Sequence, residues 1–342
     1  MYIKASTLDD LLRGVYKKLL ASNKRAKPSR GVILEETGVL LELKNPRARL
    51  SRTESRGKVF SCLGELLWYL AGTNDLEFIG YYILGYKENS EDGKTIYGGY
   101  GPRLFNKRGQ NQIENVLRLL RANSSSRRAV IQLFDAEDLI PSTNKDGQAV
   151  ARKEIPCTCT LQLMLRKQRL HMFTHMRSND AYIGLPHDVF CFTMLQEILA
   201  RSLNVELGTY KHFVGSLHLY EKDIGGASQY LEEGWQSSTI SMPLMPVADP
   251  WPAIKVLLTA ESDLRGNIIV EIDKLDLDPY WADLVRLLQI TRHYKNKNAN
   301  EIARVKESMS SQIYSAYIEK QQRKHIVAAS LTQEQFNLPI AQ

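Results

Sequence analysis

The chain has 342 residues, 43% of them hydrophobic, so it can bury a large core in one big domain or two ordinary ones. No run of about 18 apolar residues is present to span a bilayer, and the N-terminal MYIKASTLDD lacks the apolar stretch of a secretory signal, so we expect a cytosolic protein. The formal charge of +7 is modest and widely spread, which suits a small anionic ligand and makes nucleic-acid binding a weak interpretation.

The N-terminal part of the chain predicts a helix followed by a strand. Thr7 and Asp10 resemble a capping box, and apolar residues then recur at helical spacing, so a helix is expected over residues 7–22. Residues 22–53 alternate basic and turn residues around the apolar run GVLLEL, which indicates a strand between two loops.

The next predicted helix contains an unexpected acid. Residues 61–70, SCLGELLWYL, are almost wholly apolar, and Glu65 stands out because a buried carboxylate must be paired or hydrogen-bonded. A coil and a basic amphipathic helix over residues 113–120 follow, and then Arg127 and Arg128 lead into a short strand-like run. Glu65 is therefore a candidate functional residue.

The middle of the chain predicts a hairpin and a helix. Residues 159–176 alternate apolar with polar or aromatic positions on both sides of a charged turn at residues 167–168. Pro186 then begins a helix that ends near Leu203, because proline is favoured in a first helical turn.

A further strand is predicted at TYKHFVGSLHLY, residues 209–220. His218 and Tyr220 would share one face of this strand, where they could bind a sugar hydroxyl. A pair of half-buried polar aromatic side chains is an equally good interpretation of the pattern.

The composition changes after residue 223. A proline-rich connection, SMPLMPVADPWP, is followed by the strand-like run NIIVEIDKLDL and by two predicted helices over residues 280–294 and 301–324. Apolar residues from Ile302 to Tyr317 would lie on one face of the second helix. We expect this helix to pack on the body of the protein rather than to bind a partner.

Cys157 and Cys159 lie at the mouth of the predicted hairpin. This Cys-x-Cys pair has no matching second pair, and the neighbouring histidines lack zinc-site spacing, so no metal site is predicted. The chain's 4 cysteines are too few and too irregularly spaced for a disulfide framework, so reduced thiols are expected. A structural thiol is the ordinary interpretation of each, and a nucleophile would need cations that lower its pKa.

Two basic clusters are candidates for supplying those cations. Ser126-Arg127-Arg128 and Arg177-Ser178 combine guanidinium groups with hydroxyl donors, a set that converges well on phosphate. Taken alone, each cluster is more often a solvent-facing surface than a functional one.

In chain order, these features together resemble the thymidylate synthase family. The resemblance covers roughly residues 8–223, is tightest from Cys157 to Tyr220, and is poor in the later part of the chain. The matching motifs are Glu65-Leu-Leu-Trp, Tyr97-Gly, Ser126-Arg127-Arg128, Pro156-Cys157, Gln162, Arg177-Ser178-x-Asp180, Gly184-Leu185-Pro186 and His218-x-Tyr220.

The resemblance implies an α/β fold of the α+β type, in which helices flank a mixed β-sheet and two copies form a homodimer through the sheet. We expect a thymidylate synthase-like catalytic domain over residues 1–270 and a helical C-terminal extension packed on it over residues 271–342. The implied activity is a cytoplasmic step of nucleotide biosynthesis. It transfers a one-carbon unit from 5,10-methylenetetrahydrofolate, the co-substrate, to C5 of a pyrimidine nucleoside monophosphate.

The resemblance also implies a role for each matching residue. Cys157 would attack C6 of the pyrimidine, and Arg177 would favour its thiolate. Glu65 and Tyr97 would organise water and proton transfers. The nucleotide would be held by Arg30 (a better match than Arg25), Arg177, Ser178, Gln162, His218 and Tyr220, with Arg127 and Arg128 reaching across from the second subunit, while Asp180, Tyr86 and Gly184 would contact the folate.

The informative departure from the family is Asp188. Where thymidylate synthases read Gly-Leu-Pro-Phe-Asn, this chain reads Gly-Leu-Pro-His-Asp, so the base-reading asparagine has become an aspartate. A carboxylate only accepts hydrogen bonds, which suits the amino group of cytosine better than the O4 and N3–H edge of uracil. It would also stabilise a proton on N3 as charge builds in the ring. The same replacement distinguishes the deoxycytidylate hydroxymethylases that resemble this family.

Three other departures favour hydroxylation over reduction. Tyr86 and Asn89 stand where the synthases have two tryptophans that cover the folate and the reactive methylene, so water would enter more easily. Thr158 replaces the histidine that commonly follows the synthase cysteine, and the C-terminal NLPIAQ does not match the tail that closes the synthase site. If water attacks before hydride does, the product is hydroxymethyl and tetrahydrofolate leaves unoxidised.

The sequence therefore predicts a deoxycytidylate 5-hydroxymethylase, a transferase that converts dCMP to 5-hydroxymethyl-dCMP. The alternatives are hydroxymethylation of CMP, methylation of dUMP by a true thymidylate synthase, and a catalytically silent homologue that binds nucleotide or RNA. Retention of Cys157 together with the arginines argues against the silent homologue, because a binding module needs no nucleophile.

Overall fold

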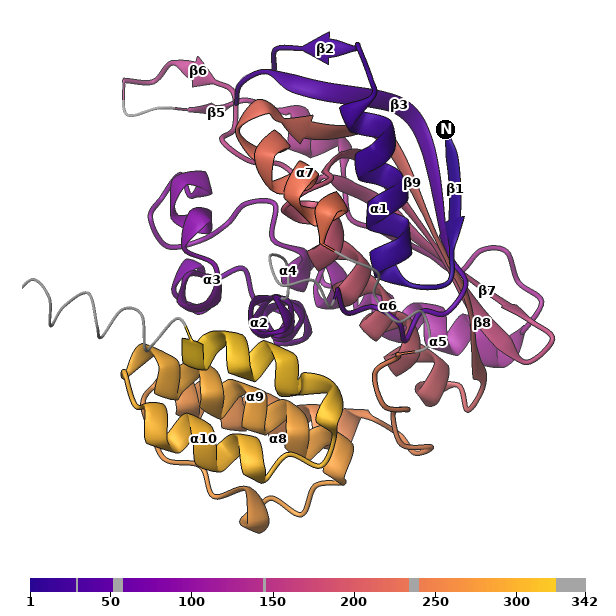
Figure 1. Cartoon of the computed structure of the whole chain (residues 1–342). Helices are drawn as coiled ribbons and strands as arrows, with labels where there is room; N and C mark the ends of the chain where they lie inside the picture. The colour runs from indigo at the N-terminus through magenta and orange to yellow at the C-terminus, as the bar shows by residue number, and fades with distance from the viewer. Residues whose placement is uncertain (29, 52–57, 144–145, 234–239, 324–342) are drawn as a thin grey trace, which may run out of the picture.

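A mixed seven-stranded sheet forms the centre of the molecule (Figure 1). The computed structural model describes residues 1–28, 30–51, 58–143, 146–233 and 240–323. The strand order is β1-β3-β9-β8-β7-β4, with β2 paired to β3; parallel pairing joins β1 to β3 and β8 to β9, and the other neighbours are antiparallel. The strands are β1 (Tyr2–Ala5), β2 (Arg25–Ala26), β3 (Ile33–Leu43), β4 (Val130–Gln132), β7 (Thr158–Arg166), β8 (Arg169–Asp180) and β9 (Glu206–Tyr220).

Helices pack on this sheet and on one another. The helices of the sheet body are α1 (Leu8–Leu20), α2 (Val59–Leu70), α3 (Leu76–Tyr82), α4 (Tyr100–Phe105), α5 (Gln112–Ala122), α6 (Gly184–Ser202) and α7 (Ile224–Glu232), with a 3-10 turn, η1 (Leu84–Asn89), after α3. A second, two-stranded sheet joins β5 (Ser142–Thr143) to β6 (Ala149–Val150). The predicted α+β arrangement of a mixed sheet flanked by helices is confirmed.

The central helix α6 is buried on all sides. Every residue from Leu185 to Arg201 is buried, including Asp188 and Glu197, and the helix contacts both β8 and β9 as well as α2. A helix that is apolar around its whole circumference belongs in the middle of a core. The N-terminal part of α6 therefore holds the carboxyl of Asp188 away from water, close to the ends of β8 and β9.

Most elements predicted from periodicity are confirmed. The helices predicted at residues 7–22, 61–70, 113–120 and 280–294 correspond to α1, α2, α5 and α9 (Pro279–Lys295). In the β7–β8 hairpin, Lys167 and Gln168 both have positive φ, 50° and 56°, as a tight two-residue turn between twisted strands requires.

Two predictions in the C-terminal part are wrong. The strand-like run at residues 267–277 forms a connection with a short 3-10 turn (Ile272–Lys274), and Ile268 and Ile269 are exposed, because this run lies among helices and meets no sheet edge. The single helix predicted over residues 301–324 is broken between α10 (Ala299–Glu307) and a helical stretch at residues 315–323, where the buried carboxylate of Asp283 accepts from the backbone N–H groups of Ser310 and Ser311.

The C-terminal helices form a layer of their own beneath the sheet body (Figure 1). Helix α8 (Trp251–Arg265) packs against α9, and α9 against α10 and α2. Tyr317 donates a hydrogen bond to the carbonyl of Ser51 at 2.7 Å, which ties this layer to the body. Because α8 and α9 pack together, contacts cross the boundary at residue 270, and the predicted division of the chain into two domains stays a prediction. In the part of the chain that the structure describes, no helix combines the length and apolarity needed to cross a bilayer.

Candidate active site

Cys157 lies immediately before β7, beside Arg177 on the neighbouring strand β8. The backbone N–H of Arg177 donates to the carbonyl of Cys157 at 2.9 Å, and its guanidinium Nη2 is 3.6 Å from Sγ. Two carbonyls of the segment before the cysteine, those of Ile155 and Pro156, accept from the same guanidinium. The strand pairing therefore holds a cation against the thiol.

Burial nevertheless keeps this thiol protonated in the ligand-free protein. The pKa of Cys157 is raised to about 11, because burial and the negative charges of Glu154 and Asp188 outweigh the lowering by Arg177 and Arg30. The thiol is thus poised between groups that favour and oppose its ionisation. The thiolate would form when a nearby acid is neutralised or when a base accepts the thiol proton.

Glu65 is buried in the middle of α2 and is hydrogen-bonded by tyrosines. The hydroxyls of Tyr69 and Tyr86 both donate to its Oε1, at 2.9 and 2.7 Å. Burial raises the pKa of Glu65, and these two hydrogen bonds partly offset that rise. The hydroxyl of Tyr86, from the turn η1, is thereby directed inward to the acid.

Asp188 lies in the first turns of α6, where an amide contacts it. Asn179 Nδ2 donates to Asp188 Oδ2 at 2.7 Å. A Cβ at Gly184 would lie 2.9 Å from that amide nitrogen, so only glycine leaves room for the contact. Burial raises the pKa of Asp188 well above its ordinary value, the charge of Glu65 raises it further, and the hydrogen bond from Asn179 opposes the rise.

Of the two tyrosines that precede a glycine in the segment YGGYG, the second lies with these groups. Tyr100 is buried, its hydroxyl accepts from the backbone N–H of Thr158 at 3.1 Å, and its pKa is raised by burial and by the charges of Asp188 and Cys157. Tyr-Gly occurs at both positions in the sequence, so the motif alone could not decide between Tyr97 and Tyr100.

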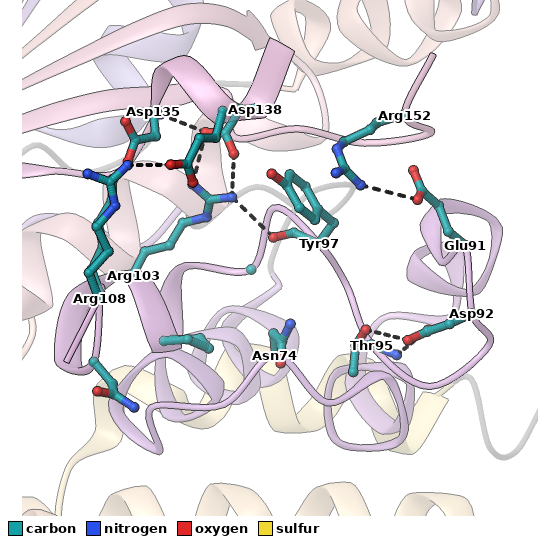
Figure 2. Close-up of a pocket in the computed structure, with 15 residues that line it drawn as sticks. Asn74, Glu91, Asp92, Thr95, Tyr97, Arg103, Arg108, Asp135, Asp138 and Arg152 are labelled. Carbon is teal, nitrogen blue, oxygen red and sulfur yellow. Dashed lines mark hydrogen bonds and ion pairs between the residues drawn. The ribbon is translucent and has the colours of Figure 1, made fainter. Parts of the chain in front are cut away.

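Tyr97, the tyrosine predicted from the sequence, points elsewhere. It lines a separate cavity of about 510 Å³, where the guanidinium of Arg152 lies 3.7 Å and that of Arg103 5.3 Å from its ring centroid (Figure 2). Arg103 in turn pairs with Asp138 at 2.7 Å. A turn closed by the backbone N–H of Gly99 and the carbonyl of Ile96, at 3.0 Å, separates the two tyrosines, and it is Tyr100 that contacts the segment of Cys157. The catalytic role of Tyr97 stays a prediction.

Arg30 lies close to the thiol, whereas Arg25 does not. The guanidinium of Arg30 donates to Asn89 Oδ1 at 2.9 Å and to the carbonyl of Lys153 at 3.2 Å, and its charge lowers the pKa of Cys157. Arg25 forms an ion pair with Glu221 instead. The structure thus brings Arg30 and Arg177 to the same short segment before the cysteine.

Strand pairing assembles a second polar group from β8 and β9. Ser178 Oγ lies 3.5 Å from His218 Nδ1, and the rings of His218 and Tyr220 meet edge to face at 5.1 Å. Asp180, opposite His218 in the parallel register, has its Oδ1 fixed by the N–H groups of Tyr182 and Ile183 at 2.7 and 3.1 Å. The pKa of Tyr220 is raised by burial and by Asp180, and the charges of Arg30 and Cys157 also act on it, so this group borders the thiol.

Arg127, Arg128 and Gln162 are not part of this cluster within one chain. Both arginines are exposed, and their guanidinium groups make no hydrogen bond or ion pair with the residues that the structure describes. Gln162 Nε2 donates to the carbonyl of Arg127 at 2.9 Å and so fixes the backbone that carries the two arginines.

Glu154 is a site residue that the sequence did not reveal. Burial raises its pKa to about 7, Arg30, Arg103 and Arg177 lower it, and Oε2 has no hydrogen-bond partner among the described residues. A Cβ at Gly98 would approach the carboxyl group to 3.1 Å, so the acid is packed against bare backbone. Its only sequence signal was an acid in the segment just before Cys157, a position where acids are usually solvated. Within the described ranges, no cluster of three or more His, Cys, Asp or Glu side chains is arranged to hold a metal.

Comparison with known proteins gives a consistent picture. Residues 40–249, more than half of the chain, match the family model of thymidylate synthase. The chain is 31% identical to a deoxyuridylate hydroxymethyltransferase of Bacillus phage SP01 over 205 residues, which cover 56% of this chain and 52% of that protein. Identity is 28% over 188 residues to the enzyme of the same name from Delftia phage PhiW-14, covering 54% and 52%. It is 30% over 182 residues to thymidylate synthase 1 of Bacillus subtilis (strain 168), covering 50% and 61%. The chain thus matches between about half and three fifths of the length of these relatives.

Proposed function

Because the chain belongs to the thymidylate synthase family, we propose that it transfers a one-carbon unit from 5,10-methylenetetrahydrofolate to C5 of a pyrimidine nucleoside monophosphate. The proposed substrate is dCMP, and the proposed product is 5-hydroxymethyl-dCMP. The observation that carries the choice of cytosine is the buried acid Asp188, which lies near Cys157 and stands where the resemblance puts the family's base-reading asparagine.

A buried carboxyl at this position matches the cytosine edge in both of its functions. One oxygen accepts from the exocyclic amino group, and a proton retained by the raised pKa of Asp188 is available to N3. When the thiolate of Cys157 adds to C6, electrons move toward N3, and a proton from Asp188 neutralises the charge that develops there. C5 then becomes the nucleophile of the next step.

Cations assigned to the phosphate would also support the nucleophile. Arg177 and Ser178 on β8, with Arg30 from the opposite side, would bind the 5′-phosphate, and His218 and Tyr220 would hold the sugar hydroxyl. Because Arg177 is 3.6 Å from Sγ, it stabilises the thiolate and the phosphate with one charge.

The residues around Glu65 suit addition of water after carbon transfer. Its carboxyl is held by Tyr69 and Tyr86, so it can orient a water molecule without itself being solvated. Tyr86 stands where the family has an indole, and its hydroxyl is committed to Glu65. Tyr100, which lies near both Asp188 and Cys157, would relay protons at C5 in the role first predicted for Tyr97.

When bound, 5,10-methylenetetrahydrofolate would supply the one-carbon unit. The donor set fits a pterin: Asp180 has one oxygen fixed by backbone N–H groups, which orients the other toward N–H donors of a ligand. Gly184 keeps the adjoining backbone free of a side chain. The folate contacts proposed for Asp180, Gly184 and Tyr86 rest on these features.

We also propose that two copies associate through the sheet. Val130 on the edge strand β4 and Phe213 on the inner strand β9 are 42% and 41% exposed, and exposed large apolar side chains on a sheet can mark an interaction surface. Arg127 and Arg128 lie shortly before Val130 in the sequence, are exposed, and make no hydrogen bond or ion pair with the part of the chain that the structure describes, so they are available to bind phosphate in a second copy. Sedimentation at several protein concentrations tests the dimer.

The deciding experiment is an assay of the purified protein with dCMP, CMP and dUMP, each labelled with tritium at C5. Tritium release from dCMP in the presence of 5,10-methylenetetrahydrofolate, with a hydroxymethyl product by mass spectrometry and no dihydrofolate absorbance, is the expected result. Release from CMP alone would move the substrate to the ribonucleotide. Cys157→Ala should abolish all release, and activity unchanged in this variant would remove the proposed mechanism.

Hydroxymethylation of dUMP is the second candidate. It is favoured by the names of the phage relatives, which are deoxyuridylate hydroxymethyltransferases. Tritium release from dUMP with a hydroxymethyl product and none from dCMP would establish this candidate in place of the first. A methyl product with dihydrofolate would instead indicate a thymidylate synthase reaction.

A further inference from the structure

A buried chain of hydrogen bonds runs from Asp188 into the core between β8 and β9. Asn179 Nδ2 donates to Asp188 Oδ2 at 2.7 Å, Asn179 Oδ1 lies 3.0 Å from His212 Nε2, and His212 Nδ1 lies 2.7 Å from the hydroxyl of Tyr210. Tyr210, His212 and Asn179 are 1%, 0% and 4% exposed, so bulk water does not compete for these contacts. None of the three takes part in the reaction steps of the proposed function.

The orientation of the Asn179 amide, with Nδ2 toward Asp188 and Oδ1 toward His212, gives the chain its direction. Burial lowers the pKa of His212 to about 3, so its ring is neutral and carries a single N–H. If the hydroxyl of Tyr210 donates to Nδ1, then Nε2 carries the proton and donates to the amide oxygen of Asn179. The amide is then fixed with its N–H₂ toward Asp188, and Oδ2 of Asp188 must act as an acceptor.

This direction determines where Asp188 can carry a proton. An oxygen that accepts a strong hydrogen bond at 2.7 Å is the poorer site for a proton, so Oδ1 becomes the protonated oxygen and Oδ2 the acceptor. A carboxyl with its proton fixed on one oxygen presents a donor and an acceptor in a fixed order. The cytosine edge requires one order and the uracil edge the reverse, because N3 accepts in cytosine and donates in uracil.

We infer that Tyr210, His212 and Asn179 are positioning residues that fix the protonated oxygen of Asp188 and thereby set the preference for cytosine over uracil nucleotides. This inference rests on the base-reading role of Asp188 in the proposed function. Without the chain, the amide of Asn179 is free to turn its oxygen toward Asp188. The proton then moves to Oδ2, which donates it to Asn179, and Oδ1 is left as an acceptor that matches the N3–H of uracil and not N3 of cytosine.

The test compares two tyrosine-to-phenylalanine variants that each remove one buried hydroxyl. Tyr210→Phe removes the donor that sets the direction of the chain. Tyr16→Phe is the matched control, because Tyr16 is 0% exposed and its hydroxyl donates to the carbonyl of Ala181 at 3.2 Å, outside the chain. The measurement is the ratio of kcat/KM for dCMP to that for dUMP, with thermal unfolding as a check on folding.

The expected result is a fall in the dCMP-to-dUMP ratio of about three- to tenfold in Tyr210→Phe, the effect of one neutral hydrogen bond. The ratio should stay within about twofold in Tyr16→Phe, since this variant loses a similar contact without touching Asp188. Equal ratios in the two variants would overturn the inference, because a purely structural role lowers both activities alike.

A double variant separates this inference from the proposed function. In an Asp188→Asn background, Tyr210→Phe should leave the ratio unchanged, since no carboxyl proton remains to be placed. An equal effect of Tyr210→Phe with and without Asp188 would refute action through the acid. If the wild-type protein uses dUMP and not dCMP, the cytosine assignment fails. The inference is then judged on the dissociation constants of dCMP and dUMP in the same variants, measured by calorimetry.

Discussion

At the C-terminal end of α6, Glu197 is buried against the guanidinium of Arg49, and both side chains are wholly inaccessible to solvent. The carboxylate also accepts from the backbone N–H of Met245 at 3.2 Å. At the N-terminal end of the same helix, Asp188 contacts an amide, and the described residues offer it no ion pair. The charge that acts on it most strongly is that of another acid, Glu65.

This contrast shows which buried acid is retained for architecture and which for chemistry. A buried carboxylate paired with a guanidinium has its charge compensated in place and joins the elements around it. An unpaired buried carboxyl has a raised pKa and destabilises the fold when it ionises. A fold retains such a group where its proton serves a reaction. The pair lies where the C-terminal helices dock, since the charge of Arg49 acts on Tyr280 and Tyr314, and the unpaired acid lies near the thiol.

The largest expected effect comes from breaking the compensated end. Arg49→Met should lower the free energy of unfolding by about 3–5 kcal/mol, because it leaves the carboxylate of Glu197 buried without its cation. Urea denaturation of the two proteins measures the difference. In the double variant Arg49→Met, Glu197→Leu, most of the loss should be recovered, since no unpaired charge remains. A loss below about 1 kcal/mol in the single variant would show that the two ends are not distinct.

The next effect concerns the unpaired end. Asp188→Asn should leave the free energy of unfolding unchanged or higher, because it removes an acid that burial disfavours in its charged form. The same variant should shift the ratio of kcat/KM from cytosine toward uracil nucleotides by about 10- to 100-fold, the discrimination of a good base contact. Loss of stability comparable to that of Arg49→Met, without a shift in selectivity, would make Asp188 an architectural residue like Glu197.

Much of the fold was predictable because its signals are local. The α6 segment and the β7–β8 hairpin follow from proline, turn and alternation patterns that depend on near neighbours in sequence. The break after α10 was not predictable, because it depends on Asp283, a residue of another helix that accepts from Ser310 and Ser311. Periodicity continues across that break, so only the tertiary contact ends the helix.

The candidate site was predictable only in part, for the same reason. Cys157, Arg177 and Asp188 were identified through motifs, but the choice between Tyr97 and Tyr100 depends on how the chain turns between Ile96 and Gly99. Likewise, His212 carries no sequence signal of its own. It becomes informative only when the parallel pairing of β8 and β9 brings it to Asn179.

The smallest expected effect tests whether Glu154, like Asp188, is an acid that acts on Cys157 without an ion pair of its own among the described residues. The pKa of this acid is raised to about 7, so its carboxyl is mostly neutral below that pH and ionised above it, where its charge raises the pKa of Cys157. Glu154→Gln should therefore increase alkylation of Cys157 by iodoacetamide about three- to tenfold at pH 8 and change it little at pH 5.5.

The sign of the pH dependence of stability gives a second measurement on the same variant. A carboxyl whose pKa is higher in the folded than in the unfolded chain binds its proton more tightly when folded, so the free energy of unfolding falls as pH rises from about 4.5 to 7. That fall should be smaller in Glu154→Gln. Glu91→Gln is the matched control, because Glu91 accepts from the neighbouring Lys153 N–H at 3.0 Å, a contact that glutamine can keep. If Glu154→Gln and Glu91→Gln changed the alkylation rate of Cys157 equally, Glu154 would act only as a surface charge. The buried acids without an ion pair near the thiol would then be Asp188 and Glu65 alone among the described residues.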